Sequence, residues 1–264
     1  MSSAAALSVG SLEAGGGGGL PADLKTFESL GVNGTSVATA VTTQEGSALT
    51  VLHDLPVTVV REQLRAARQA PPPKAVKVGL VTTVPVIRLL AADLPGLLVP
   101  IVVDPEMTGN GEPRLLRQTS ISALARDLLP AATIVTPNLV EASVLAGFAI
   151  RGEADAKRAA RAIQQFGPQA VLIKGRQAEG NVIVDGLLDG RTWMTFRHPR
   201  LGDRHHHGAG ATLSAALTAY LALGETLPDA VRMALDYVHR ALAAAPGFAA
   251  GLGPLGHRDA GSVE

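Results

Sequence analysis

The stretch Thr133-Ile134-Val135-Thr136-Pro137-Asn138-Leu139-Val140-Glu141-Ala142-Ser143-Val144-Leu145-Ala146 decides the fold class of this chain. It opens on a short apolar run, Thr133–Val135, which is typical of a strand buried on both faces. A polar turn containing Pro137 follows, and Leu139–Ala146 then has the pattern of a helix. A strand that runs through a polar turn into a helix is the repeating unit of a parallel sheet covered by helices.

The same unit recurs on both sides of this stretch. Further buried strands are expected at Ala4–Val9, Thr35–Val41, Ala75–Val81, Leu98–Val103 and Ala170–Ile173. Helices are expected at Ala22–Leu30, Val57–Ala70, Val84–Leu94, Pro113–Leu129, Ala154–Phe166, Thr212–Leu223 and Asp229–Ala244. Asn181–Leu187 and Thr192–Phe196 predict an antiparallel hairpin at one edge. The sequence therefore predicts an α/β fold with a mainly parallel sheet, as one domain over residues 1–264.

Composition narrows the classes of partner. The chain has 264 residues, 47% of them hydrophobic and 17% charged, which allows a large core. Lys and Arg together number 23, as do Asp and Glu, so nothing predicts a nucleic-acid or membrane partner. The absence of cysteine excludes disulfides, zinc–thiolate sites and thiol catalysis. The N-terminus has no basic region before a long apolar core, and no apolar run reaches the length of a membrane span. We expect a cytoplasmic protein that forms a homodimer.

Polar residues follow the predicted strands at one edge of the sheet. They are Gln44, Asp104, Asn138, Glu141, Lys174 and the Gly-Ala-Gly turn (residues 208–211). Ligands bind open α/β sheets at the carboxyl ends of the strands, so this common placement predicts a site there.

Two of these features have alternative interpretations. Asn138 and Glu141, three residues apart, share one helix face and with Asp104 could orient hydrated Mg²⁺. On spacing alone, an N-cap Asn with a capping-box Glu is the more common arrangement. Lys174 either reaches phosphates or turns to solvent.

Two glycine-rich segments precede helices. His205-His206-His207-Gly208-Ala209-Gly210-Ala211-Thr212-Leu213-Ser214 places consecutive N–H groups before a helix, which favours an anion site over a turn without a ligand. At most two of its adjacent histidines could serve one metal site. The glycine loop (residues 15–19) is either a flexible linker or a backbone that a ligand approaches closely. Pro21, at a position that favours a first helical turn, supports the second interpretation.

Several sequence blocks occur in the order found in one known family. They are Ala6-Leu7-Ser8-Val9-Gly10, Ala22-Asp23-Leu24-Lys25-Thr26-Phe27, Thr39-Ala40-Val41-Thr42-Thr43-Gln44, Lys77-Val78-Gly79-Leu80, Val103-Asp104-Pro105, Thr136-Pro137-Asn138-Leu139-Val140-Glu141-Ala142, Leu172-Ile173-Lys174-Gly175, His207-Gly208-Ala209-Gly210 and Gly251-Leu252-Gly253-Pro254-Leu255. With these blocks the chain resembles hydroxymethylpyrimidine/phosphomethylpyrimidine kinase, the thiamine-biosynthesis branch of the ribokinase-like superfamily. The resemblance covers essentially the whole chain.

The resemblance implies a three-layer α/β/α ribokinase-like fold without a separate lid domain. It implies transfer of the ATP γ-phosphoryl to 4-amino-5-hydroxymethyl-2-methylpyrimidine and then to its monophosphate, with Mg²⁺. The implied residues fall into four groups. They are Gln44, Val41, Gly18, Gly19 and Asp23 for the pyrimidine, Lys174, Asn138 and Thr136 for ATP, Glu141 and Asp104 for Mg²⁺ through water, and Gly208, Ala209, Gly210 and Ala211 for the anion hole.

Three positions depart from the family pattern. Glu13 stands where the family has Asp, and Pro21 where it has Gln. Ala211 replaces the Cys of the family, or the Asp of the wider superfamily, that serves as the base for the substrate hydroxyl. Asp203 or one of the three histidines at 205–207 is an alternative base.

Two classes of function follow from these positions. The first is a kinase for the pyrimidine, slow without the usual base, or for a pyridoxal-type alcohol. The second is a non-catalytic descendant that binds pyrimidine or nucleotide as a sensor or partner subunit. Retention of Asn138, Glu141 and Lys174 favours the kinase, whereas Ala211 favours the binding protein.

Overall fold

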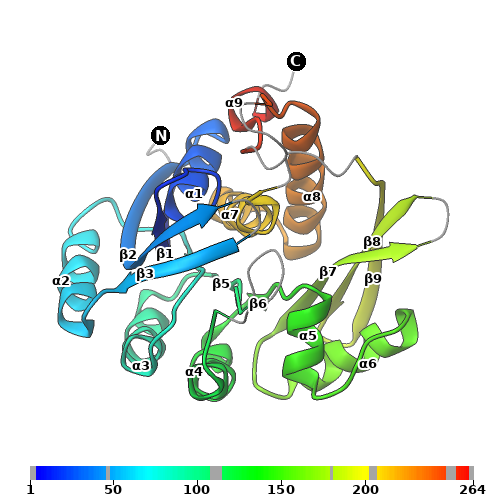
Figure 1. Ribbon diagram of the computed structural model, residues 1–264, viewed down its shortest axis with the longest axis horizontal. Coiled ribbons are helices and arrows are strands. Elements are labelled where there is room, and N and C mark those ends of the chain that lie inside the picture. Colours follow the sequence, from blue (N-terminus) through cyan, green and yellow to red (C-terminus); the bar gives the residue numbers. More distant parts are fainter. Residues whose placement is uncertain are drawn as a thin grey trace.

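The strands of the described residues form one nine-stranded sheet (Figure 1). The computed structural model describes residues 4–45, 48–107, 115–178, 181–201, 207–247 and 254–261. The strands are β1 (Ala5–Glu13), β2 (Asn33–Glu45), β3 (Ala48–Asp54), β4 (Ala75–Val78), β5 (Ile101–Val103), β6 (Ile134–Val135), β7 (Ala170–Ala178), β8 (Val182–Asp189) and β9 (Thr192–Pro199). Their order in the sheet is β3-β2-β1-β4-β5-β6-β7-β8-β9.

The middle of the sheet is parallel, as predicted. Strands β2, β1, β4, β5, β6 and β7 run in one direction, while β3 and the β8–β9 hairpin are antiparallel additions at the two edges. The hairpin expected from residues 181–196 is confirmed. Because β1 pairs with β2 on one side and β4 on the other, the chain reverses its direction of winding at β1. Such a switch point leaves a crevice at the carboxyl ends of the strands.

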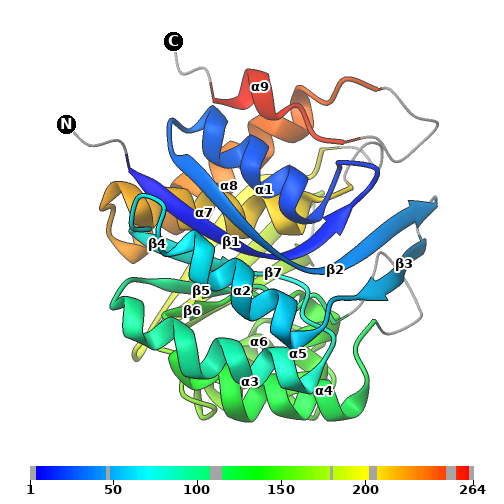
Figure 2. The same cartoon turned by 90° about the vertical axis from the view of Figure 1, so that its left-hand side faces the viewer.

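Helices cover both faces of the sheet (Figure 2). They are α1 (Gly19–Ser29), α2 (Val57–Ala67), α3 (Val84–Asp93), α4 (Gln118–Ala123), α5 (Leu139–Ala146), α6 (Glu153–Gln164), α7 (Ala209–Leu223), α8 (Leu227–Ala243) and α9 (His257–Ala260). Helices α1, α7, α8 and α9 lie on one face and α2 to α6 on the other. This arrangement confirms the three-layer architecture. None of the described helices is long and apolar enough to cross a membrane.

Helix α7 is the central element of its layer. Its residues from Ala211 to Ala222 are all buried, because it packs on β1, β4 and β5 and is covered by α1 and α8. A helix that is apolar around its whole circumference is stable only in such a position. The packing places the N-terminus of α7 beside the carboxyl ends of the central strands, where Asp104 and Lys174 lie.

The structure differs from the sequence prediction at several element bounds, most clearly in four elements. The strand expected at 98–103 begins only at Ile101, because Leu98 ends a 3₁₀ turn at φ +55° and is 92% exposed. The helix expected at 113–129 begins only at Gln118 and passes into a π-helical turn at Leu124–Leu128 and a 3₁₀ turn at Leu129–Ala131, where Pro130 cannot donate a backbone hydrogen bond. Strand β1 continues past Val9 because a register shift after Gly10 preserves its pairing with β2. Strand β3 was not predicted, since as an edge strand it leaves side chains such as Leu52 exposed.

Candidate active site

A cavity of about 470 Å³ opens at the carboxyl edge of the parallel strands. Its polar wall comes from strand ends and the turns after them, and its apolar wall from α7, α8 and β8. The lining includes Ser11, Glu13, Gly18, Gly19, Gln44, Asp104, Glu106, Asn138, Glu141, Lys174, Asp185, His198, His207 and the Gly-Ala-Gly turn, with Leu49, Ile183, Leu213, Leu235, Val238 and Leu242. The polar residues expected to share one sheet edge therefore do share one cavity.

Three residues implied by the resemblance do not line this cavity. Val41 lies within β2 and pairs with His53 of β3. Thr136 is fully buried after β6, and its hydroxyl has no hydrogen-bond partner among the described residues. Asp23 is buried inside α1, where Ser8 Oγ donates to its Oδ2 over 2.6 Å and Lys77 pairs with its Oδ1. Asp203, considered above as a base, lies outside the described residues, as do His205 and His206.

The glycine loop and the Gly-Ala-Gly turn interlock. Gly208 has φ +82°, and a Cβ at this position would overlap the carbonyl oxygen of Gly17. A Cβ at Gly17 would in turn overlap the imidazole of His207. Two backbones in such close contact require glycine at both positions. The glycine loop is thus a packed wall of the cavity, which contradicts the linker interpretation.

A carboxylate–imidazole pair joins the two loops. His207 Nε2 lies 3.0 Å from both Oε1 and Oε2 of Glu13, and Gly17 N donates to Glu13 Oε1 over 3.3 Å. Burial alone would raise the pKa of Glu13, but the contact with His207 and the amide bonds outweigh it and lower the pKa. Glu13 is therefore ionised at neutral pH. The sequence marked Glu13 only as a departure from the family pattern, because its partner lies 194 residues away.

The N-terminus of α7 has the features of an anion site. The first N–H groups of a helix have no partner within the helix. Gly208, at the N-cap, has no side chain to supply one, and the first turn of α7 contains no acidic residue that would repel an anion. The N–H groups of this turn and the positive end of the helix dipole can therefore bind a phosphate. Ala211 in this turn presents only a methyl group and is 8% exposed.

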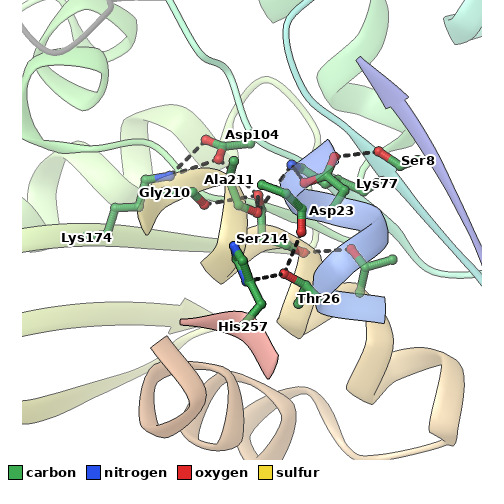
Figure 3. Close-up of polar contacts among 12 residues, drawn as sticks. Ser8, Asp23, Thr26, Lys77, Asp104, Lys174, Gly210, Ala211, Ser214 and His257 are labelled. Carbon is green, nitrogen blue, oxygen red and sulfur yellow. Dashed lines mark hydrogen bonds and ion pairs between the residues drawn. The ribbon is translucent and has the colours of Figure 1, made fainter. Parts of the chain in front are cut away.

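Lys174 and Asp104 form an ion pair beside this turn (Figure 3). Lys174 Nζ lies 2.9 and 3.0 Å from the two carboxylate oxygens of Asp104. The ammonium also lies against Gly210, because a Cβ there would come within 3.2 Å of Nζ. Lys174 therefore points into the cavity and not to solvent. It places a positive charge where the turn would hold an anion.

Asn138 and Glu141 form the capping box that their spacing predicted. Glu141 N donates to Asn138 Oδ1, and Asn138 N donates to Glu141 Oε2, each over 2.9 Å. Glu141 Oε1 accepts a further bond of 2.9 Å from Met107 N. Burial raises the pKa of Glu141 to about 7, against the opposing effect of Lys174.

These oxygen atoms fit a hydrated magnesium ion. The described residues contain no group of three or more acidic or histidine side chains that could enclose a metal directly. Mg²⁺, however, keeps several waters and is usually held by one or two carboxylates together with substrate phosphates. Asp104 and Glu141 supply two such carboxylates on the cavity wall.

Three charged residues at or beside this cavity were not predicted: Glu106, Asp185 and Lys77. Glu106 lines the cavity at φ +41°, and burial raises its pKa to about 8. Lys77 is fully buried under the first turn of α7. The sequence signal for Lys77 was a single lysine within the otherwise apolar strand Ala75–Val78. Glu106 gave no comparable signal, because its exposure depends on how the chain turns after β5.

Comparisons with known proteins agree with this geometry. A family model described as "Phosphomethylpyrimidine kinase" matches residues 13–256. The hydroxymethylpyrimidine/phosphomethylpyrimidine kinase of Rhizobium meliloti is 42% identical over 257 residues, covering 96% of this chain and 97% of the relative.

Solved structures show the same fold. The pyridoxal kinase of Staphylococcus aureus in complex with AMP-PCP and pyridoxal matches with a TM-score of 0.89 and 32% identity, over 98% of this chain and 95% of that one. The phosphomethylpyrimidine kinase of Clostridium difficile 630 matches with a TM-score of 0.78 and 33% identity, over 89% and 97%.

The fold and the cavity together define a ribokinase-like phosphotransferase. Within this class, the chain belongs to the phosphomethylpyrimidine kinase family.

Proposed function

We propose that the protein transfers the γ-phosphoryl group of ATP to the hydroxymethyl group of 4-amino-5-hydroxymethyl-2-methylpyrimidine, and then to the phosphate of the product. Relatives covering nearly the whole chain are named for both steps. The observation that carries the proposal is that the Gly-Ala-Gly turn and Lys174 line one cavity together with Gln44 of β2 and apolar side chains of α8. Helix α7, which the turn begins, packs on the central strands β1, β4 and β5, whereas β2 and β8 lie on opposite sides of them in the sheet.

The two ends suit different ligands. Gln44 and the backbone at Gly18 and Gly19 form a polar end that can hydrogen-bond a small pyrimidine. Leu235, Val238 and Leu242 of α8 form an apolar wall at the other end, which suits the adenine ring. ATP bound in this direction would place its γ-phosphate at the N-terminus of α7, facing the hydroxymethyl group.

The charges at the turn suit the transferred group. Phosphoryl transfer has a loose transition state and depends mainly on positioning and on neutralising charge. The amides of residues 208–211 and Lys174 would contact the phosphoryl oxygens. Asp104 and Glu141 would hold Mg²⁺ through water, and the metal would add charge neutralisation.

The expected rate of phosphoryl transfer depends on the residue at position 211, which is Ala211. A methyl group accepts no proton, and general-base assistance contributes about 10²–10⁴-fold to a rate. The remaining parts of the site position and neutralise the phosphoryl group without a base. We therefore expect a slow kinase.

The test is ATP-dependent phosphorylation of the hydroxymethylpyrimidine by the natural protein, Ala211→Cys and Ala211→Asp. Slow turnover that rises by about 10²-fold or more in either variant supports the proposal. Ala222→Cys, at the far end of α7, controls for the introduction of a thiol. The same assay with pyridoxal tests the alcohol of the structural neighbour.

A binding protein without turnover is the second candidate, and the observation that favours it is Ala211. If all three proteins are inactive, calorimetry with the pyrimidine and with AMP-PCP decides. Tight binding of either ligand supports the binding function, and binding of neither rejects both candidates.

A further inference from the structure

Lys77 is a buried charge that the proposed reaction leaves unexplained. Its side chain is 0% exposed within β4 and does not line the cavity. Burying an ammonium costs free energy unless it is paired and hydrogen-bonded. Burial alone would lower the pKa of Lys77, but the Asp23 carboxylate beside it raises the pKa, so the ammonium stays charged.

The contacts of Lys77 lead to the first turn of α7 (Figure 3). Its Nζ pairs with Asp23 Oδ1 of α1 and donates to the carbonyl oxygen of Ala211 over 3.3 Å. Asp23 is held in turn by Ser8 Oγ of β1. The pair thus connects α1, β1 and β4 to the residue that occupies the expected base position.

The connection continues to the phosphate side of the cavity. Ser214 Oγ lies 3.0 Å from the carbonyl oxygen of Ala211 and 3.0 Å from Asp104 Oδ2. Asp104 holds Lys174 in its ion pair. One series of polar contacts therefore runs under the cavity, from α1 through the first turn of α7 to Lys174 (Figure 3).

We infer that Lys77, paired with Asp23, is a positioning residue that sets the Gly-Ala-Gly turn and the Asp104–Lys174 pair relative to each other for phosphoryl transfer. The inference rests on the proposed function. Misplacing a reacting group by about 1 Å can lower a rate on the order of 10²-fold. A contribution to folding stability is a weak explanation for the Lys77–Asp23 pair, because a protein whose buried ion pair is replaced by apolar residues is often as stable as the original.

The decisive variant is Asp23→Asn/Lys77→Met. It removes both charges, keeps the side-chain volumes close, and leaves an amide that can accept from Ser8 Oγ. We expect Tm to stay within about 4 °C of the natural protein. We expect kcat to fall by about tenfold or more, with the KM for the pyrimidine changed by less than about threefold. A purely structural pair would leave kcat unchanged in this folded variant, and that result overturns the inference.

Tyr237→Phe is the matched control. It removes a part-buried contact of 2.6 Å with Ser29 Oγ and a bond of 3.3 Å to the carbonyl oxygen of His257, both in the same helix layer and away from the cavity. It should lower Tm and leave kcat unchanged. If Asp23→Asn/Lys77→Met fails to fold, the test uses Ser8→Ala instead. This variant removes only the hydroxyl partner of Asp23. That variant should lower kcat with KM unchanged, and an unchanged kcat overturns the inference.

A binding measurement separates this inference from the proposed function. The ratio of the Kd for ADP to the Kd for AMP-PCP reports how well the turn and Lys174 hold the terminal phosphate. We expect the ratio to fall in Asp23→Asn/Lys77→Met even if the natural protein does not phosphorylate the pyrimidine. An unchanged ratio together with an unchanged kcat rejects the positioning role, whereas an inactive natural protein with a changed ratio rejects only the proposed reaction.

Discussion

At the scale of the residue, the chemistry depends on Ala211. It lies in the first turn of α7, between the glycine loop and the Asp104–Lys174 pair, where a side chain able to accept a proton would reach the cavity. The other groups of the proposed site are present. The Gly-Ala-Gly turn, Lys174, Asp104 and Glu141 line one cavity, as the sequence predicted. Ala211 therefore leaves the first turn of α7 without a base, whereas His207, the described one of the alternative bases, lines the same cavity and is paired with Glu13.

The chain offers a direct probe of this position, since it contains no cysteine. In Ala211→Cys we expect the thiol pKa to lie below about 8.5, because a helix N-terminus stabilises a thiolate. The pH dependence of alkylation by iodoacetamide measures this pKa without interference from other thiols. Leu223→Cys, at the exposed C-terminal end of α7, should have a higher thiol pKa. Identical profiles for the two variants would contradict the assigned electrostatics of the turn.

At the scale of the element, the site is built by two loops that fit each other. The glycine loop enters α1 and the Gly-Ala-Gly turn enters α7, so their contact fixes the relation between the two helices. Glu13 and His207 hold this contact from opposite ends of the sequence. Because Glu13 is ionised and buried, the pair is a specific interaction and not a surface contact.

Gly17→Ala tests this interlock. Its Cβ would overlap the His207 ring, so the ring must move and its contact with Glu13 must weaken. We expect the free energy of unfolding to fall by about 1–3 kcal/mol and the KM for the pyrimidine to rise. Urea unfolding and steady-state kinetics measure the two effects. In Gly96→Ala no atom lies within 4 Å of the new Cβ, and a similar loss there would show that the effect is not specific to the loop.

At the scale of the whole molecule, the C-terminal helix α9 docks on the layer that contains the site. His257 of α9 is 5% exposed, and its Nδ1 lies 3.3 Å from Thr26 Oγ1 of α1. Its Nε2 is buried with no partner among the described residues. Burial, together with the nearby charge of Lys25, lowers the pKa of His257 to about 4. The packing of α9 therefore requires a neutral imidazole.

This requirement predicts a pH dependence of stability. An unfolded histidine titrates near 6.5, so between pH 6.5 and 4 the unfolded chain binds the proton more readily than the folded one. Stability should fall as pH falls through this window, by about 3 kcal/mol in full, and should not change from this source above pH 6.5. Urea unfolding of the natural protein and of His257→Asn measures the effect. Equal slopes in this window for both proteins would contradict it.

The sequence predicted the parallel sheet and much of the site for one reason. Asp104, Asn138 and Glu141 follow parallel strands, and Lys174 lies in β7 just beyond its parallel pairing with β6. Parallel strands bring their carboxyl ends to one edge whatever their order. The capping box was predictable because both partners lie within one helical turn. The Lys77–Asp23 pair was not, since its partners are 54 residues apart on different elements.

What the sequence by itself determined were the local features: the alternation of strands and helices, the strand-end positions of the polar residues, and the lack of a base at Ala211. These depend on periodicity, turn chemistry and residue type, which act over a few residues. Only the tertiary structure decided that the glycine loop packs against His207 at Gly17 and Gly18, that Glu13 contacts His207, and that Lys77 lies under α7. Such contacts depend on which elements pack together, and packing brings together residues that no local pattern relates.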